Sequence, residues 1–407
     1  MVIEFAPIAK DETSAFLTVE SSAFGVVFDP EDLAYWERVL DLKRTLAARE
    51  DGAIVGTSAT LALDMTVPGG EALPAAAVTM VTVAPSHRRR GILTGMMTRL
   101  LEIAHERGEP LAALWASESP IYGRFGYGLA IEDESWEIER PYARLASAPP
   151  APGSIRLVDE AYARARFPEV WERTRVGRVG MTGRGELLWE DRFRDRPFAR
   201  DGGTAYFFVA YEEGGRLDGY ALYRVKSSWP SALPSNEITV VEAIAATDAA
   251  HAGLWRFLLD IDLSRTVSAQ HRPLDDALPH MLADYRRLRR QRRDAIWLRL
   301  VDVGAALEAR TYATAGSLVL AVEEDTCPWN PARFTLETGA EGGHLAPTDA
   351  APDLSVRAAD LGAIYLGGQR PSTLARAGRI QEHRTGALAL ADSMFATSQA
   401  PWCPQFF

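Results

Sequence analysis

One segment constrains the fold of this chain more than any other, because a strand, a basic turn, a helix and a second strand follow one another in it. Residues 75–83 (AAAVTMVTV) form an apolar run of strand length, and residues 111–116 (LAALWA) form another. After the turn APSHRRRG, apolar residues recur at helical spacing: Ile92, Leu93, Met96, Met97, Leu100, Leu101 and Ala104. Two buried strands joined through an amphipathic helix predict an α/β layer architecture.

The turn before that helix predicts an anion site. Arg88 and Arg89 precede Gly91, which lies directly before the free backbone N–H groups of the helix start. A helix N-terminus carries partial positive charge, glycine lets a phosphate approach the backbone, and arginine forks match phosphate oxygens. The turn lacks the sequence of a P-loop or of a dinucleotide fold, so we expect the pyrophosphate of coenzyme A as its ligand. Taken alone, the same residues could equally form a solvated turn.

Length and charge exclude several other classes of protein. At 407 residues the chain exceeds what one hydrophobic core usually supports, so we expect more than one domain. No apolar run approaches the roughly 20 residues of a membrane-spanning helix and the first residues lack a secretory pattern, so we expect a cytoplasmic protein without a membrane span. The net charge of −11 disfavours nucleic acid, and we expect the run RRLRRQRR (286–293) to be a solvated face.

The residues that commonly bind metals are not arranged for it. Cys327 and Cys403 are the two cysteines, and neither has a Cys or His partner at ligand spacing. The histidines and aspartates between residues 271 and 280 lack the i, i+4 histidine pair of a zinc helix. We therefore expect no disulfide framework and no metal.

The segments VTVAPSHRRRGIL (81–93) and ASESPIYGRFGYG (116–128) together resemble the enhanced intracellular survival (Eis) branch of the GNAT acetyltransferase superfamily. The likeness continues through GYALYRV (219–225), DALPH (276–280), WLRLVDVGAALEARTYA (297–313), LGAIYLGG (361–368) and the C-terminal Phe407. No single segment is unique to the family, but their order and spacing are specific.

The resemblance implies an α/β (α+β) protein in three parts. We expect an N-terminal GNAT domain with the coenzyme A site at residues 1–146, a central GNAT-like domain at 147–298, and a sterol-carrier-protein-like domain at 299–407. The Pro- and Ala-rich segment 146–154 supports the first boundary, whereas no change of composition marks the second. The central region has no Arg-Arg-x-Gly turn after a strand, so we expect one coenzyme A site per chain. The resemblance also implies a homo-oligomer, commonly a hexamer.

The resemblance further assigns roles to single residues. Its cofactor-binding positions correspond here to Val81, Val83, Arg88, Arg89, Gly91 and Ser117. Tyr122 matches the general acid of the family, and the terminal carboxylate of Phe407 matches its base. Without the resemblance, Tyr122 could equally be a core aromatic and Phe407 the end of a mobile tail.

The acceptor side is less well defined by the sequence. Its aromatic and apolar positions correspond to Trp36, Met80, Trp189 and Tyr312, of which the last two could equally be packing residues. Mycobacterial members of the family acetylate aminoglycosides in a pocket with acidic groups. Because Val26 and Phe406 replace two of those groups here, we expect an aminoglycoside-like or more apolar amine, or a lysine side chain.

The function that these residues predict is acetyl transfer from acetyl-CoA to a primary amine. A carboxylate of pKa about 3.5 is mismatched with an ammonium of about 10.4, so Phe407 would accept the proton only as attack on the thioester makes the nitrogen acidic, or through a water. The alternative is a non-catalytic protein that binds a lipid or an acyl-CoA with its C-terminal domain.

Overall fold

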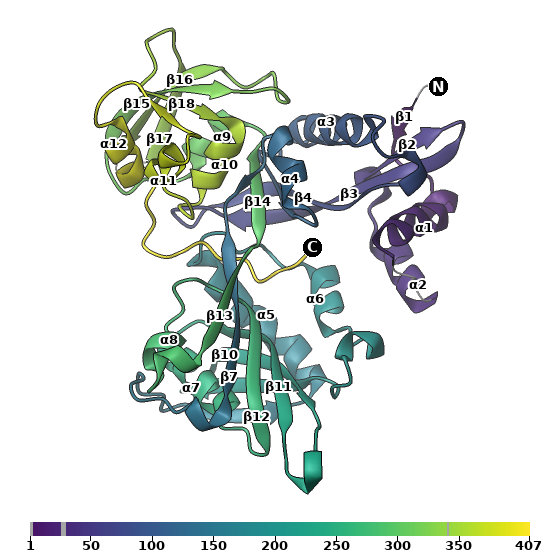
Figure 1. The fold of residues 1–407 in the computed structure, drawn as a ribbon, viewed down its shortest axis with the longest axis vertical. Coiled ribbons are helices and arrows are strands. Elements are labelled where there is room, and N and C mark those ends of the chain that lie inside the picture. The colour runs from purple at the N-terminus through teal and green to yellow at the C-terminus, as the bar shows by residue number, and fades with distance from the viewer. Residues whose placement is uncertain (1–2, 26–29, 340–341) are drawn as a thin grey trace. The chain divides into compact units, whose positions relative to one another are not determined.

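The computed structural model describes residues 3–25, 30–339 and 342–407 of the chain (Figure 1). Its contacts divide the chain into two compact units. Unit 1 comprises Met1–Ile131, Ala295–Ser398 and Phe406–Phe407, and unit 2 comprises Glu132–Asp294 and Gln399–Gln405. Each unit is therefore built from segments that are distant in the sequence.

The first sheet of unit 1 has seven strands in the order β1-β2-β3-β4-β5-β14-β6. Their bounds are β1 (Glu4–Ala6), β2 (Thr45–Glu50), β3 (Ala53–Thr66), β4 (Ala72–Val83), β5 (Leu111–Trp115), β14 (Ile296–Leu300) and β6 (Gly128–Leu129). The helices of this region are α1 (Thr13–Phe24), α2 (Pro30–Val39), α3 (Ile92–Glu106) and α4 (Ser119–Tyr122). β4 and β5 pair in parallel, since α3 carries the chain back between them.

The predicted strand, turn, helix and strand are confirmed as β4, α3 and β5. The apolar stripe of α3 is buried at Ile92, Met96, Met97, Leu100, Leu101 and Ala104. These side chains belong to two apolar clusters that also contain residues of β2, β4 and β5, so the helix is fixed on the sheet. The start of α3 is thereby held at the end of β4.

The C-terminal part of unit 1 contains a five-stranded sheet of order β17-β16-β15-β18-β19. Its elements are α9 (Val303–Ala309), β15 (Gly316–Glu323), β16 (Arg333–Gly339), β17 (Gly342–Pro347), β18 (Leu354–Arg357), α10 (Ala358–Tyr365), α11 (Pro371–Arg376), β19 (Gln381–Glu382) and α12 (Ala387–Met394). Helix α10 packs directly on the backbone of β6 and β14. A Cβ on Gly128 would lie 1.8 Å from the carbonyl oxygen of Ala359, so only glycine permits this approach.

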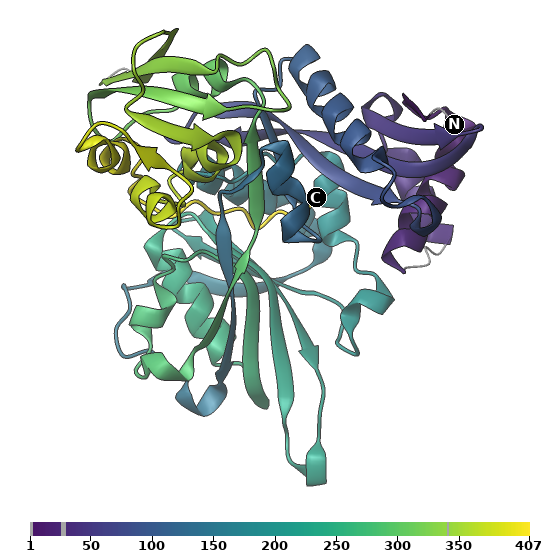
Figure 2. The ribbon, with the colours of Figure 1, turned by 45° about the horizontal axis from the view of Figure 1, so that its top comes forward.

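Unit 2 is built on one seven-stranded sheet of order β13-β7-β12-β11-β10-β9-β8. Its strands are β7 (Glu132–Glu139), β8 (Ser154–Val158), β9 (Phe207–Glu213), β10 (Arg216–Lys226), β11 (Asn236–Ala245), β12 (Ser264–Arg272) and β13 (Arg289–Asp294), and its helices are α5 (Glu160–Val176), α6 (Glu186–Phe193), α7 (Asp248–Leu259) and α8 (Leu278–Met281). Residues of α7 contribute to one apolar cluster, and residues of α5 and α6 contribute to another. Figure 2 shows the same ribbon turned by 45° about the horizontal axis. Within the described ranges of both units, no helix is long and apolar enough to cross a membrane.

The arginine run 286–293 ends in β13, the edge strand of this sheet. Its side chains pair with the acidic residues of β7, for example Arg289 with Glu137 at 2.5 Å and Arg292 with Glu132 at 3.8 Å. Most of the strand is exposed. As expected from the sequence, the run is therefore a solvated, charge-compensated face.

The boundaries between the two units differ from the domain boundaries expected from the sequence. β7, which lies before the expected boundary at 146/147, pairs with β12 and β13 of unit 2, because its carboxylates face the arginines of β13. β14, which spans the expected boundary at 298/299, pairs with β5 and β6 of unit 1. The contacts do not separate the first region from the C-terminal one, so those boundaries stay a prediction.

Candidate functional site

The site expected from the sequence begins where β4 and β5 separate. Their parallel pairing ends at Val78 and Leu114, and β4 continues to Val83 alongside β3 alone. The register with β3 slips by one residue between Thr79 and Thr82, which marks a bulge. Met80 within it has a φ of +54°, and the Thr57 hydroxyl donates to its carbonyl oxygen at 2.8 Å. One edge of β4 after Val78 is thus free for an extended ligand, and Val81 and Val83 lie on this stretch.

The free end of β4 leads into the start of α3. Gly91 is the residue before the helix, with a φ of +79° and no side-chain cap on the first N–H groups. A Cβ placed on Gly91 would have no heavy atom within 4 Å, so the space in front of the helix is open. The first turn of a helix of this length can bind an anion through its unpaired donors and its dipole.

The basic residues of this turn divide into two groups. Arg90 binds Glu50 at the end of β2, with Nη1 3.0 Å from Oε2, and His87 Nε2 lies 3.1 Å from the same oxygen. These contacts, first the hydrogen bond from Arg90, hold the pKa of Glu50 below its usual value. Arg88 and Arg89 are exposed, and the ion pairs of this turn with carboxylates of the described residues involve His87 and Arg90 instead. Two guanidinium groups therefore remain available to an anion in front of α3.

Tyr122 and Ser117 follow β5 at the same edge of the sheet. Tyr122 is the last residue of α4 and is 5% exposed, and its ring lies 6.2 Å from that of Tyr127. Burial raises the pKa of Tyr122, and a hydrogen bond from Ser117 partly opposes this shift. The phenol is therefore neutral at neutral pH and can donate its proton. Because β4 and β5 are parallel neighbours, the residues that follow them lie at one edge.

The end of the chain contacts the same region of unit 1. The Phe406 ring lies 5.4 Å from the ring of Trp115, the last residue of β5. Phe407 is buried, at 9% exposed. Phe406 thus lies beside the end of β5, the strand that Ser117 and Tyr122 follow, and the role of the Phe407 carboxylate stays a prediction.

Comparisons with known proteins agree along the whole chain. An acetyltransferase (GNAT) domain family matches residues 4–130, a second family of the same description matches residues 180–300, and the sterol carrier protein domain family matches residues 303–404. An uncharacterized N-acetyltransferase of Streptomyces avermitilis is 39% identical over 100% of both chains. N-acetyltransferase Eis of Mycobacterium bovis is 35% identical over 98% of each chain. The crystal structure of Eis1 from Mycobacterium abscessus is similar at a TM-score of 0.87 and 34% identity, with 100% of both chains covered.

The chain belongs to the Eis-type GNAT N-acetyltransferases. It is an acyltransferase with two GNAT domains followed by a sterol-carrier-protein-like domain, as the resemblance implied. The roles of single residues are a separate question, which the geometry of this chain addresses.

Two of the four expected acceptor-side residues of this N-acetyltransferase lie together. Trp36 on α2 and Met80 on β4 pack in one apolar cluster with Phe16 of α1. Glu20, one turn after Phe16 on α1, was not singled out from the sequence. Its Oε2 is buried without a hydrogen-bond partner among the described residues, and burial raises its pKa to about 7. Val26, where the family pattern has an acidic residue, lies outside the described residues.

The other two acceptor-side residues lie in packed surroundings. Trp189 belongs to unit 2, where it is 8% exposed and clusters with Trp171, Phe193 and Tyr220. The hydroxyl of Tyr312 donates to the carbonyl oxygen of Leu307 at 2.7 Å. Neither set of contacts involves a residue of the β4–α3 region, so their part in acceptor binding stays a prediction.

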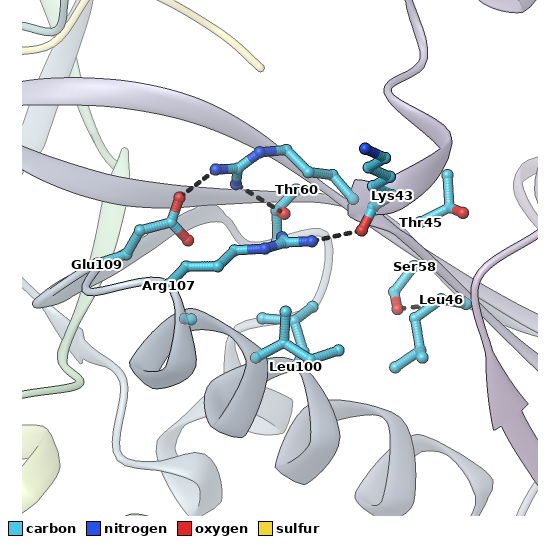
Figure 3. A pocket seen from close by; sticks show the side chains of 11 residues that line it. Lys43, Thr45, Leu46, Ser58, Thr60, Leu100, Arg107 and Glu109 are labelled. Atoms are coloured by element: carbon cyan, nitrogen blue, oxygen red, sulfur yellow. Dashed lines mark hydrogen bonds and ion pairs between the residues drawn. The ribbon is translucent and has the colours of Figure 1, made fainter.

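A small cavity near the start of β2 is separate from these groups (Figure 3). Arg44 binds Glu109 at 2.5 Å across it, and Arg107 donates to the carbonyl oxygen of Lys43. Its volume of about 10 Å³ has room for one water molecule at most. Elsewhere in the described ranges, no three acidic, histidine or cysteine side chains are grouped as metal ligands would be.

Proposed function

We propose that this chain transfers the acetyl group of acetyl-CoA to a primary amine at the carboxyl edge of β4 and β5. The observation that carries the proposal is the free stretch of β4 that leads into an uncapped helix start, with two unpaired arginines beside it. These are the donors that a pyrophosphate requires. The same edge holds a buried, neutral phenol within reach of a reacting group.

The residues of this edge fit coenzyme A by their chemistry. Arg88 and Arg89 would bind the pyrophosphate together with the first N–H groups of α3, and the absence of a side chain on Gly91 leaves room for it. The backbone of Val81 and Val83 would pair with the pantetheine as an added strand, and Ser117 would contact it from β5. Acetyl-CoA supplies the activated acyl group as a thioester.

The acid is assigned to Tyr122, which follows β5, and the base to the terminal carboxylate of Phe407. Tyr122 would donate its proton to the leaving sulfur, and Ser117 supports this role because its hydrogen bond makes the phenol more acidic than burial alone would leave it. The Phe407 carboxylate would take the proton of the amine, directly or through a water. The low exposure of Phe407 favours this role, because a buried last residue is held in place rather than sampling solvent.

The acceptor is proposed to be a small-molecule amine, aminoglycoside-like or more apolar, or a lysine side chain. The apolar cluster of Trp36 and Met80 supports an acceptor with apolar surface, and the unpaired carboxylate of Glu20 on the neighbouring helix supports a cationic one. We also propose a cytoplasmic homo-oligomer, on the family resemblance alone.

The proposal is tested by release of the coenzyme A thiol from acetyl-CoA with and without a panel of primary amines, followed by mass spectrometry of the product. We expect thiol release to depend on the amine and the product to gain one acetyl group. Binding of acyl-CoA or lipid without amine-dependent turnover for any amine would favour the alternative of a non-catalytic binding protein.

A further inference from the structure

The turn that follows Tyr122 brings the chain from α4 into β6. Gly126 lies in this turn with a φ of +78°, a conformation that favours glycine. Its N–H donates to the carbonyl oxygen of Gly123 at 3.1 Å, and the Tyr127 N–H donates to the carbonyl oxygen of Tyr122 at 3.3 Å. The Tyr122 backbone is thus hydrogen-bonded into the turn, so the position of its phenol depends on what fixes the turn.

A buried arginine of β14 lies directly on this turn. A Cβ on Gly126 would lie 2.7 Å from the Arg299 Cζ and overlap the guanidinium, so only glycine leaves room for the arginine. Arg299 is 1% exposed. β14 pairs with β6 through Leu298 and Gly128, which brings the residue after Leu298 beside the turn. The guanidinium therefore limits the movement of the backbone that follows Tyr122.

A carboxylate of the C-terminal part of unit 1 binds this guanidinium. Glu324, which directly follows β15, accepts a hydrogen bond from Arg299 Nη2 through its Oε2. Its other oxygen, Oε1, accepts the Thr326 and Cys327 N–H groups, each at 2.9 Å. Burial alone would raise the pKa of Glu324, but the Arg299 charge holds it below its usual value. The carboxylate is thus ionised and fixed by its own loop, so its bond to Arg299 has a defined direction.

A second contact from the same part of the chain fixes the segment after the turn. The Ala359 carbonyl oxygen of α10 lies against the backbone of Gly128. Glu324 and Ala359 both belong to residues 303–404, the match to the sterol carrier protein domain family. A buried ion pair seldom raises stability, because the cost of desolvating two charges offsets their attraction. The pair of Glu324 and Arg299 is therefore better explained by the direction that it imposes on the turn.

We propose that Arg299, oriented by Glu324, is a positioning residue that holds the turn after Tyr122 and thereby places its phenol for proton transfer to the leaving sulfur. All three residues belong to unit 1. Arg299 acts through the backbone of Gly126 rather than on a reacting atom. The sterol-carrier-protein-like part thereby contributes to acetyl transfer through one carboxylate. This inference rests on the proposed function, in which Tyr122 is the acid.

The test removes both charges of the pair together. Arg299→Met with Glu324→Gln keeps side chains of similar length and leaves no buried charge without a partner. We expect kcat to fall about ten- to a hundredfold, since displacing a catalytic group by about 1 Å can cost that much. The KM for acetyl-CoA should stay near the wild-type value, because Arg88 and Arg89 are unchanged. A kcat close to that of the wild type would overturn the positioning role.

Arg299→Lys carries the test if the double variant does not fold. Lysine keeps a positive charge beside Glu324 but lacks the planar guanidinium that covers Gly126. We expect a smaller fall in kcat than in the double variant, again without a change in the KM for acetyl-CoA. Full activity of the folded lysine variant would show that the guanidinium does not place the phenol.

Arg44→Met with Glu109→Gln is the matched control. Arg44 and Glu109 form another arginine–glutamate pair of unit 1, joined at 2.5 Å, with side chains 17% and 6% exposed. Both line the small cavity of Figure 3 rather than the turn after Tyr122. We expect kcat to stay near the wild-type value. An equal fall in both double variants would assign the effect to the loss of any buried ion pair and overturn the inference.

A double-mutant cycle with Tyr122→Phe separates positioning from a structural effect. The phenylalanine variant has no acid to place, so the changes at Arg299 and Glu324 should cause no further loss of kcat in it. If they lower kcat by the same factor in both backgrounds, Arg299 does not act through Tyr122 and the inference is wrong. If Tyr122→Phe alone leaves kcat unchanged, Tyr122 is not the acid, and the positioning role falls with that part of the proposed function.

Fluorine NMR of protein labelled with 3-fluorotyrosine reports the phenol without reference to activity. The chain has 12 tyrosines, and the Tyr122 resonance is the one that is absent from Tyr122→Phe. We expect the double change of Arg299 and Glu324 to shift or broaden this resonance, and the double change of Arg44 and Glu109 to leave it as it is. An unaltered resonance in the first variant would show that the ring is held without the pair, and would overturn the positioning role even if the acetyl-transfer proposal holds.

Discussion

The β4–α3 turn of unit 1 and the β11–α7 turn of unit 2 share their backbone design and differ in their chemistry. In each, a strand bulges just after its last parallel pair and then leads into a helix. Before α3 stands Gly91, which offers no cap. Before α7 stands Thr247, whose hydroxyl accepts the Ala250 N–H at 3.1 Å, and Asp248 follows it in the first turn. The first helix start is open to an anion, and the second is capped and faces an acidic side chain.

The charged side chains near the two parallel strand pairs also differ between the units. In unit 2, burial alone would raise the pKa of Glu242, but Arg184 lowers it to about 2. Arg184 also donates a hydrogen bond to Gln405 near the end of the chain. In unit 1, Arg88 and Arg89 are exposed, and the carboxylate of Glu50 pairs with His87 and Arg90 rather than with them. An exposed arginine without an ion-pair partner costs little free energy of folding. Its guanidinium group remains available to bind a phosphate. The two regions thus share a strand geometry and differ in the charge that they present at the helix start.

The largest effect is expected from a change at the chain end, whose carboxylate is the proposed base of the open site in unit 1. Adding one glycine after Phe407 turns its carboxylate into an amide and moves the charge by up to about 3.6 Å. We expect kcat to fall by roughly 10²- to 10⁴-fold, the usual contribution of a general acid or base. Phe407→Leu keeps the carboxylate and should be the milder change. A folded, extended enzyme with near-normal kcat would rule out the carboxylate as base.

Tyr122→Phe tests the acid of the open site. The change removes one hydroxyl from a buried ring, so packing is kept while the proton donor is lost. We expect kcat to fall by about 10²-fold and the affinity for acetyl-CoA to be unchanged. Tyr127→Phe is a matched control, because Tyr127 is buried in the same cluster but has no proposed role. Wild-type kcat in Tyr122→Phe would remove this residue from the mechanism.

The arginine turn itself is tested by the double change of Arg88 and Arg89 to alanine. We expect the KM for acetyl-CoA to rise about ten- to a hundredfold, with a much smaller effect on the KM for the amine, since only phosphate contacts are lost. Arg286 and Arg287, an exposed arginine pair of unit 2, provide the control when both are changed to alanine. If both double variants have the same KM for acetyl-CoA, the turn does not bind the cofactor.

Local patterns made part of this structure predictable from the sequence. The β4–α3–β5 order rests on residues within one short segment, where periodicity is sufficient, and the turn chemistry of the same segment predicts the anion site. The pairing of β14 with β5 in the first sheet was not predictable, because two strands nearly 200 residues apart leave no periodic signal of their contact in the sequence. The three-part order came from family resemblance rather than from the pattern of residues.

The same limit applies to the site. Arg88, Arg89 and Gly91 form a motif, whereas Glu50, which holds the turn, is an isolated acid at a strand end. The Arg184–Gln405 bond joins residues 221 positions apart. No spacing rule connects them, and Gln405 stands in a tail without any periodic pattern. Long-range polar contacts of this kind become visible only in the folded chain.

The smallest effect is expected from a change of Glu20 in unit 1. This buried acid differs from Glu242, which is paired with an arginine. Burial raises the pKa of Glu20 to about 7, so its folded form prefers the neutral acid. Its contribution to stability is therefore full below the unfolded pKa of about 4.3 and is lost as pH rises through 7. Glu20→Gln should match the wild type in urea unfolding at pH 4.5 and exceed it by about 1 kcal/mol at pH 8, after allowance for partial exposure. Glu37→Gln, an exposed change on α2, should show no such pH dependence. Equal stability of Glu20→Gln and the wild type at pH 8 would mean that a partner already compensates this carboxylate.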